Sequence, residues 1–332
     1  MPGVCVFDGP VPYRYIGVNL QDILRVDIVL KITGRMRYDW RVRNQGKPRG
    51  KPMQHYGPRL KAGIEQSGIL PFIGVYDTFS AGIAGQHFDN IFISGFSFAA
   101  SYYGLPDIGF IAWPDMVDFT RRVRSILPQH HIIVDMDDGY SDVEVACHAA
   151  WNLEQAGASA IVLEDQQRPR RCGHLPGKQI LPIDDYVRKL ERVLETRRDM
   201  LVVARTDVVE KDSLERVKAY AQAGADLVLA DGITHLETLV RIREEVGLPV
   251  VFNQIYGGKS APVDLDELQR CGVSVVLFST PCLFAAQAAV DGAMSALKAA
   301  NGLLSEEISG GVSLSDAVTN LEANLRARDT YE

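Results

Sequence analysis

The sequence of 332 residues predicts an α/β protein, most simply a closed (β/α)8 barrel of the TIM type. Short β-rich runs recur eight times after residue 68, and helical patterns lie between them. Several of these runs are almost wholly apolar, as strands covered on both faces are. A doubly wound open sheet is the alternative, but no GxGxxG motif follows the first expected strand.

Alternation of strand and helix predicts right-handed βαβ units and a parallel sheet. The expected strands are Leu70–Val75, Asn90–Ser94, His131–Asp135, Ala160–Glu164, Met200–Arg205, Asp226–Ala230, Pro249–Phe252 and Ser274–Phe278. The expected helices of the barrel region are Tyr56–Gln66, Val143–Gln155, Asp184–Thr196, Ser213–Ala223, His235–Val246 and Leu265–Cys271.

Three regions are expected along the chain: a basic N-terminal extension (1–55), a barrel catalytic domain (56–300) and a C-terminal helical tail (301–332). Helical patterns at Leu283–Lys298 and Leu314–Arg328 exceed what one barrel helix needs. They suggest a helix that reaches onto a neighbouring subunit.

Charge is divided unevenly. Residues 1–62 carry 12 Lys or Arg and 4 Asp or Glu, whereas residues 63–332 carry 23 and 38. The basic extension could bind nucleic acid or lie against an acidic neighbouring subunit. Aromatic residues are thinly interleaved with its basic residues and no nucleic-acid-binding signature is present, so the second interpretation is favoured.

The cysteines and the hydropathy indicate a cytoplasmic protein. The five cysteines are scattered, odd in number and not in CxxC pairs, which is typical of a reducing compartment. No apolar run approaches the roughly 18 residues of a membrane span. No secretory signal is recognisable at the start.

Polar residues follow the expected strands where catalytic groups of a barrel gather. Asp135, Asp137 and Glu164 end adjacent strands, so their carboxylates should converge and need a cation. Oxygen ligands without His or Cys suggest Mg²⁺, with Mn²⁺ possible. A solvated acidic rim is the alternative.

Two further residues could take part in substrate binding or catalysis. Arg205 ends an apolar strand and would clamp a substrate carboxylate or phosphonate, or pair with the nearby acids. Cys172 lies in RPRRCGHLPGK, where flanking cations should favour the thiolate in a mobile loop. That setting suits a proton donor or acceptor in a site that closes over its substrate, although a loop cysteine can also be inert.

These residues lie in motifs that resemble the isocitrate lyase / phosphoenolpyruvate mutase superfamily over Gly74–Val290. The matching motifs are YDTFSA, SGFSFAASYYGLPD, DMDDGY, LEDQQRPRRCGHLPGK, ARTD, AGADLVLAD and FNQIYGGKSAP. The resemblance implies an α/β barrel, Mg²⁺ at the strand ends, a gating loop and a homotetramer that exchanges a C-terminal helix.

The resemblance also implies roles for single residues. Catalytic roles fall to Cys172 as general acid and to Glu164, His174 and Arg205. The metal group is Asp107, Asp135, Asp137 and Glu164, and substrate contacts are expected from Ser94, Gly95, Phe96, Arg205, Asn253 and Tyr256.

The implied reaction cleaves the C2–C3 bond of a methylisocitrate-like or 2-alkylmalate-like 2-hydroxy acid, giving an α-keto acid and a second carboxylate. An oxaloacetate-type hydrolase or a phosphonate-forming mutase on the same scaffold is the alternative, and a non-catalytic binding role is the third. The CGH loop favours the lyase branch.

Several positions depart from the pattern of the superfamily and bear on substrate identity. They are Asp138, Asp231, Tyr256, Phe284 and Phe92, the last standing where lyases usually carry a tyrosine that is a candidate base. Tyr102 or Tyr103 is the expected substitute for that tyrosine.

Overall fold

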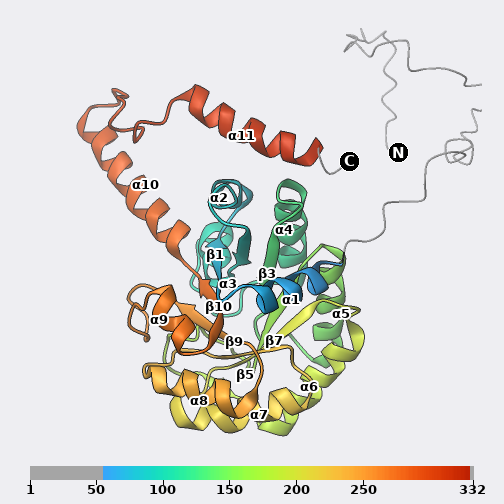
Figure 1. The fold of residues 1–332 in the computed structure, drawn as a ribbon. Coiled ribbons are helices and arrows are strands. Elements are labelled where there is room, and N and C mark those ends of the chain that lie inside the picture. Colours follow the sequence, from blue (N-terminus) through green and yellow to red (C-terminus); the bar gives the residue numbers. More distant parts are fainter. Residues whose placement is uncertain (1–54, 330–332) are drawn as a thin grey trace, which may run out of the picture. The chain divides into compact units, whose positions relative to one another are not determined.

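The computed structural model describes residues 55–329, so the predicted N-terminal extension lies outside the described residues. Eight parallel strands close into a barrel in the order β1-β10-β9-β8-β7-β4-β3-β2 (Figure 1). The strands are β1 Leu70–Val75, β2 Asn90–Ile93, β3 His131–Asp135, β4 Ala160–Glu164, β7 Leu201–Thr206, β8 Leu227–Ala230, β9 Val250–Gln254 and β10 Val273–Phe278. The predicted (β/α)8 barrel is confirmed.

Helices follow the strands and cover the outside of the barrel (Figure 1). The α-helices are α1 Tyr56–Gln66, α2 Thr78–Ala84, α3 Gly95–Phe98, α4 Trp113–Ile126, α5 Val143–Gln155, α6 Ile183–Thr196, α7 Ser213–Gln222, α8 Leu236–Val246, α9 Leu265–Arg270, α10 Pro281–Ala299 and α11 Leu314–Asp329. A π-helical turn, η3 Ala99–Tyr103, and a 3-10 turn, η4 Glu210–Asp212, complete the set.

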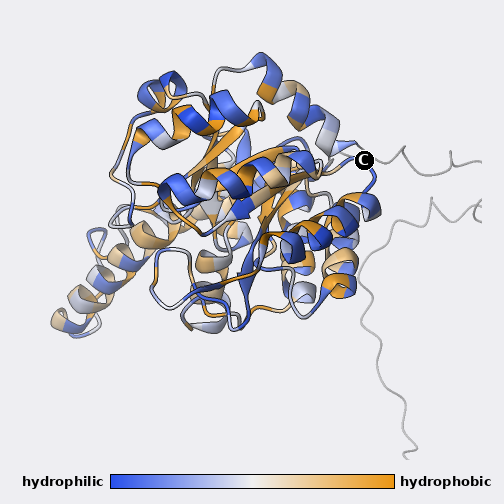
Figure 2. Ribbon diagram, turned by 90° about the horizontal axis from the view of Figure 1, so that it is seen from below, coloured by the Kyte–Doolittle hydropathy of each residue, from blue (hydrophilic) through white to orange (hydrophobic). Residues whose placement is uncertain are grey.

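The strands bury both faces, as their apolar sequences predict. One face fills the barrel interior, where Phe72, Phe92, Val162 and Leu229 belong to a single buried cluster. Leu60 of α1 joins that cluster. The opposite face packs against the surrounding helices. In Figure 2 the strands are predominantly orange, while the helices around them mix blue with orange.

The loop that carries Cys172 leaves the barrel between β4 and α6. Its two ends are held together by a short antiparallel pair, β5 Gln166–Gln167 and β6 Gln179–Ile180. The side-chain amide of Gln166 donates to the backbone oxygen of Arg171 at 2.7 Å, and its carbonyl accepts from the Arg171 amide at 2.9 Å. These contacts fix where the loop begins and therefore which way it crosses the barrel.

The two C-terminal helices differ in their packing. Helix α10 has no buried residue and exposes Val290 and Met294. Helix α11 returns to lie against α2 and α4 (Figure 1). Within residues 55–329, no helix combines the length and the apolar character that crossing a membrane requires.

Candidate active site

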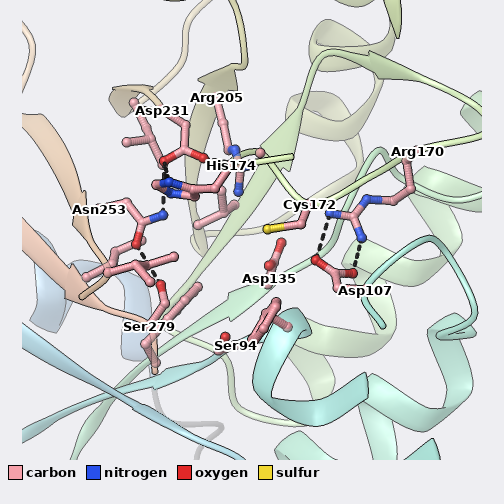
Figure 3. A pocket seen from close by; sticks show the side chains of 17 residues that line it. Ser94, Asp107, Asp135, Arg170, Cys172, His174, Arg205, Asp231, Asn253 and Ser279 are labelled. Atoms are coloured by element: carbon pink, nitrogen blue, oxygen red, sulfur yellow. Dashed lines mark hydrogen bonds and ion pairs between the residues drawn. The ribbon is translucent and has the colours of Figure 1, made fainter. Parts of the chain in front are cut away.

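The polar residues at the carboxyl ends of successive barrel strands converge on one pocket (Figure 3). Ser94 follows β2, Asp135 ends β3, Asn253 lies in β9 and Ser279 follows β10. Carboxyl ends of parallel strands share one mouth in a closed barrel, so distant sequence positions become neighbours. Among the predicted site residues, Ser94, Phe96, Asp107, Asp135, Cys172, His174, Arg205 and Asn253 line this pocket, whose cavity volume is about 20 Å³.

A buried ion-pair cluster lies beside the pocket, with Arg170 at its centre. The Arg170 side chain is 1% exposed. Its Nε donates to Glu164 Oε1 at 2.7 Å, and its Nη1 lies 3.2 Å from Asp137 Oδ1. Both Nη atoms also donate to the Asp107 carboxylate. Three of the four predicted metal carboxylates are therefore gathered around one guanidinium.

Asp135 completes the acidic group on the pocket side. Its Oδ1 accepts from the Asp137 amide at 3.1 Å, and its Oδ2 accepts from the Gly95 amide at 3.3 Å. Asp137 has a φ of 51°, a left-handed conformation that is uncommon for aspartate and typical of functional sites. The strained turn directs two carboxylates that are two residues apart into the same region.

Burial dominates the electrostatics of this group. It raises the pKa of Asp135 and of Asp137, and it raises the pKa of Glu164 to about 8, while Arg170 and Arg205 oppose the shift. Both side-chain oxygens of Asp137 and Glu164 Oε2 are buried without a hydrogen-bond donor. The cluster therefore contains more carboxyl groups than guanidinium groups.

Its oxygen atoms suit a hard divalent cation, and the three oxygens that accept no hydrogen bond are positions where such an ion would gain ligands. Among the described residues, however, no three Asp, Glu, His or Cys side chains lie close enough together, as they stand, to hold a metal ion. Arg170 accounts for this difference from the expected convergence, because its guanidinium stands among the carboxylates.

Arg205 makes the ion pairs that were the alternative to substrate binding. Its Nη2 lies 2.8 Å from Asp231 Oδ2 and 2.9 Å from Asp207 Oδ1, and 3.4 Å from Glu164 Oε2. Its Nε is buried without a hydrogen-bond partner, although the residue lines the pocket. One donor of this guanidinium is therefore open, and a substrate contact by Arg205 stays a prediction.

Cys172 does not have the thiolate character expected from its sequence neighbours. The residue is 8% exposed, and burial raises the pKa of its thiol to about 11. Arg170 is turned into the acidic cluster, and Lys178 donates to the Gly173 oxygen at 2.6 Å. The flanking cations are thus engaged elsewhere, and the prediction of a thiolate was wrong. Figure 3 shows the sulfur directed into the pocket, near Asp135.

His174 is fixed by the segment after β9. Its Nδ1 accepts from the Lys259 amide at 3.0 Å, so a neutral ring carries its proton on Nε2. That Nε2 lies 3.7 Å from Asp231 Oδ1. Burial lowers the pKa of His174, which favours this neutral form at pH 7. The residue can donate a hydrogen bond toward the pocket but holds no fixed charge there.

The SGF segment sits at the start of α3. Ser94 caps the helix by accepting from the Ser97 amide at 3.3 Å. A Cβ atom on Gly95 would lie 2.9 Å from Asp135 Oδ2, so only glycine allows this close approach. Phe96 lines the pocket, and its ring meets Phe284 edge to face with centroids 6.4 Å apart.

Three tyrosines expected near the chemistry lie elsewhere. Tyr256 is 84% exposed in the turn after β9, and Ile255 occupies the pocket wall instead. Tyr102 is exposed, and the Tyr103 hydroxyl donates to Asp115 at 2.5 Å on the outer surface. None of these three tyrosines lines the pocket, so substrate contact by Tyr256, and replacement of a base at Phe92 by Tyr102 or Tyr103, stay predictions.

The other departures have local explanations. Asp138 is turned away from the pocket and pairs with Arg168 at 2.8 Å. Asp231 reaches Arg205 and also accepts from Asn253 Nδ2 at 2.9 Å. Neither substitution leaves the acidic group or Arg205 without its partners.

Two residues of the site were not assigned a role from the sequence. Arg170 was expected only as a flanking charge of Cys172, although its place two residues before the cysteine ties it to the same loop. Ser279 donates to Asn253 Oδ1 at 2.6 Å. Its position just after the last strand is the signal that could have found it.

Fold and site together define a barrel enzyme with an acidic pocket at the carboxyl end of its strands. A family model described as phosphoenolpyruvate phosphomutase matches residues 60–298. The chain belongs to this family, which agrees with the resemblance of its motifs.

Individual relatives narrow the class. The chain is 33% identical over 233 residues to the 2-methylisocitrate lyase of Aeropyrum pernix, covering 69% of this chain and 75% of that one. It is also 33% identical over 245 residues to the chloroplastic carboxyvinyl-carboxyphosphonate phosphorylmutase of Arabidopsis thaliana, covering 71% and 72%.

A crystal structure of 2,3-dimethylmalate lyase, described as a PEP mutase/isocitrate lyase superfamily member, superposes with a TM-score of 0.77. The identity is 28%, and the match covers 83% of this chain and 95% of that one. Lyases and a mutase are thus among the enzymes most similar to this chain.

Proposed function

We propose that this protein is a Mg²⁺-dependent carbon–carbon lyase that cleaves a 2-hydroxy di- or tricarboxylate of the methylisocitrate or 2-alkylmalate type. The products would be an α-keto acid and a second carboxylate. The observation that carries the proposal is the buried Cys172 thiol directed into a pocket beside Asp135 and Ser94, where burial raises its pKa to about 11. Such a thiol can donate a proton to a carbanion.

In the proposed reaction the C2 hydroxyl loses its proton to a base, C2 becomes a carbonyl carbon, and the C2–C3 bond breaks. The bonding electron pair passes to C3 of the departing carboxylate. Cys172 Sγ–H then protonates C3 and is left as a thiolate, which recovers a proton before the next turnover. Arg205, whose Nε faces no other acceptor, would hold the carboxylate on which the charge develops.

Asp135, Asp137, Glu164 and Asp107 would hold the metal ion, directly or through water. Bound Mg²⁺ would stabilise negative charge on the substrate oxygens, and Mn²⁺ would suit the same oxygen donors. The support for this assignment is the excess of buried carboxyl groups over guanidinium groups and the three buried carboxyl oxygens that accept no hydrogen bond. His174, held as the Nε2–H tautomer, would donate to substrate oxygen.

A phosphonate-forming mutase is the second candidate, because a plant phosphorylmutase is as similar in sequence as the archaeal lyase. An oxaloacetate-type hydrolase on the same scaffold would use the same acidic group. The three activities differ in their products, so they are separated by one set of assays.

The test is incubation with Mg²⁺ and methylisocitrate, isocitrate, 2,3-dimethylmalate, citramalate, oxaloacetate and phosphonopyruvate, with products identified by mass spectrometry. We expect pyruvate or glyoxylate together with a second carboxylate, and loss of all turnover after chelation that Mg²⁺ reverses. Turnover of phosphonopyruvate alone, or oxalate release from oxaloacetate alone, would replace the lyase by the mutase or the hydrolase. Full activity after complete metal removal would contradict the metal assignment.

We also propose a cytoplasmic homotetramer. The four cysteines in the described part of the chain are unpaired, as expected in a reducing compartment. Helix α10 exposes Val290 and Met294, and an apolar groove beside its base is lined by Phe79, Ile83 and other residues. Exchange of α10 between two copies would cover both surfaces.

Replacing Met294 with Asp should lower the oligomeric state, because a charge buried in an apolar interface has no partner. Light scattering coupled to size exclusion measures the mass, and Asp291→Asn on the same helix is the control. A tetramer that survives Met294→Asp would refute the exchange of α10.

A further inference from the structure

The tip of the loop between β5 and β6 covers the pocket. Cys172 and His174 of this tip point into the pocket (Figure 3), and Gly173 between them also lines it. The cavity that remains is about 20 Å³, which is room for about one water molecule. A di- or tricarboxylate is much larger. The tip, which the β5–β6 pair anchors only at its base, must therefore move aside before substrate enters and return before the thiol acts.

The backbone of Gly173 lies directly on the ion pairs of Arg205. A Cβ atom added here would overlap Asp231 Oδ2 and Arg205 Nη2 and would lie 2.7 Å from Asp207 Oδ1. Glycine alone allows so close an approach. Because Cys172 is the preceding residue, whatever holds Gly173 in this place also sets the position of the thiol.

Two lysines from different parts of the chain donate to one atom, the backbone oxygen of Gly173. Lys178 Nζ lies 2.6 Å from this oxygen, and Lys259 Nζ lies 2.8 Å from it. Lys178 stands at the base of the loop, directly before β6, whereas Lys259 belongs to the segment after β9. The oxygen is therefore held at the same time from the base of its own loop and from a separate segment of the barrel mouth.

Each lysine has a second contact that orients it toward Gly173. Lys178 Nζ also donates to the Asp207 backbone oxygen at 3.3 Å and lies 3.6 Å from Asp207 Oδ1, whose negative charge offsets the repulsion between the two ammonium groups. The Lys259 amide donates to His174 Nδ1 at 3.0 Å, which ties this lysine to the next residue of the tip. Neither lysine lines the pocket.

We propose that Lys178 and Lys259 are positioning residues that hold the Gly173 carbonyl at the barrel mouth and thereby set the position of the Cys172 thiol, and that both contacts break when the loop admits substrate. Both lysines act through Gly173, outside the pocket. The inference rests on the proposed lyase function for the step that the thiol performs, whereas the two contacts are a property of the protein alone. Loss of both ammonium groups should raise the fraction of molecules with an open loop.

Alkylation of Cys172 by iodoacetamide measures how often the loop opens, because the residue is only 8% exposed in the closed pocket. Mass spectrometry of the Cys172 peptide gives the rate in the full chain at a fixed pH. Lys178→Met and Lys259→Met keep the length of each side chain and remove its ammonium group. We expect the double variant to react at least about tenfold faster than the wild type, since losing a hydrogen bond from a charged donor shifts an equilibrium by about that factor or more.

Three controls show whether the loop alone has opened. Gly173→Ala displaces the tip from the Arg205 ion pairs directly and gives the rate of an open loop. Lys211→Met removes an exposed lysine in η4 and should react at the wild-type rate. Cys147, buried in α5, is the reference within each sample. An unchanged Cys172 rate in the double variant would overturn the proposal, and so would a rise that Lys211→Met or Cys147 shares.

Turnover separates the positioning role from the proposed reaction. With the substrate that proves active, the double variant should lower kcat by at least about tenfold, since a reacting group misplaced by about 1 Å costs up to about 100-fold. Lys259→Arg should retain more of kcat than Lys259→Met. Faster alkylation in a protein that turns over no 2-hydroxy acid would retain the two contacts and reject the lyase function. Faster alkylation with an unchanged kcat would overturn the positioning role.

Discussion

Cys172→Ser is expected to reduce turnover by about 10³-fold, within the range that a lost general acid or base costs. Serine keeps the size of the side chain and its position in the loop, but its hydroxyl is a much weaker acid than a thiol. Because no hydrogen bond joins Cys172 Sγ to the acidic group in the described part of the chain, Mg²⁺ binding measured by calorimetry should stay within about twofold of the wild type. Cys271→Ser, at the end of α9 and outside the pocket, is the control and should be fully active.

The same residue predicts a pH dependence. The thiol must be protonated to act as an acid, and burial raises the pKa of Cys172 to about 11. Activity should therefore not decline through loss of this proton between pH 7 and pH 9, and should decline only as the pH approaches 11. A fall in kcat as the pH rises through about 8, present in the wild type and absent in Cys172→Ser, would instead indicate a thiol with an ordinary pKa. Wild-type turnover by Cys172→Ser would remove the cysteine from the mechanism altogether.

The barrel could be predicted because each strand has its own local signal. Strands β1, β3 and β4 and helices α1 and α5 begin and end where their apolar spacing indicates. Helices α2 and α4 were not predicted. Both carry N-terminal signals in the sequence, Asp77 as a capping residue and Pro114 with Asp115 in the first turn, but neither stands beside a long regular pattern.

The site was predictable only where topology alone determines position. Ser94, Asp135, Arg205 and Asn253 lie at the carboxyl ends of strands, so barrel closure brings them together whatever their side chains do. The positions of loop residues do not follow from the barrel topology. Ile255 and Tyr256 are neighbours in one turn, and only the three-dimensional packing decides which of them enters the pocket.

The pKa of Cys172 could not be predicted from its charged neighbours in the sequence either. The sequence places four cationic or titratable side chains around the thiol, and from their number a lowered pKa is expected. The fold instead buries Arg170 among carboxylates and the thiol in the pocket wall, so burial outweighs proximity in the sequence. The direction of a side chain in a loop depends on its tertiary contacts, and the spacing of residues in the sequence gives no information on those contacts.

Arg170→Met should produce opposite changes in stability and in metal affinity. In the absence of metal, three buried carboxylates lose their common cation, and removing one partner of a buried ion pair costs about 3–5 kcal/mol. Mg²⁺ would then enter a group of carboxylates that no longer holds a guanidinium. We expect its affinity to rise by at least about tenfold, as measured by calorimetry.

The thermal shift caused by Mg²⁺ provides the second measurement. A ligand that binds only the folded state stabilises it in proportion to the logarithm of its concentration over Kd, so saturating Mg²⁺ should raise the Tm of Arg170→Met more than that of the wild type. Arg168→Met is the matched control, because Arg168 lies in the same loop and pairs with Asp138 outside the cluster. Its Mg²⁺ affinity should not change.

Turnover by Arg170→Met should fall, although its affinity for Mg²⁺ is expected to rise. Arg170 lies two residues from Cys172, and the Cys172 amide donates to the backbone oxygen of Asp107 at 3.0 Å. The Asp107 carboxylate in turn accepts from Arg170, so Asp107 links the loop to the cluster. Loss of the guanidinium should leave the thiol poorly positioned and lower kcat even when Mg²⁺ is saturating, with partial recovery in Arg170→Lys. If Arg170→Met binds Mg²⁺ no more tightly than the wild type, the guanidinium and the metal ion do not compete, and the cluster must accommodate both cations at once.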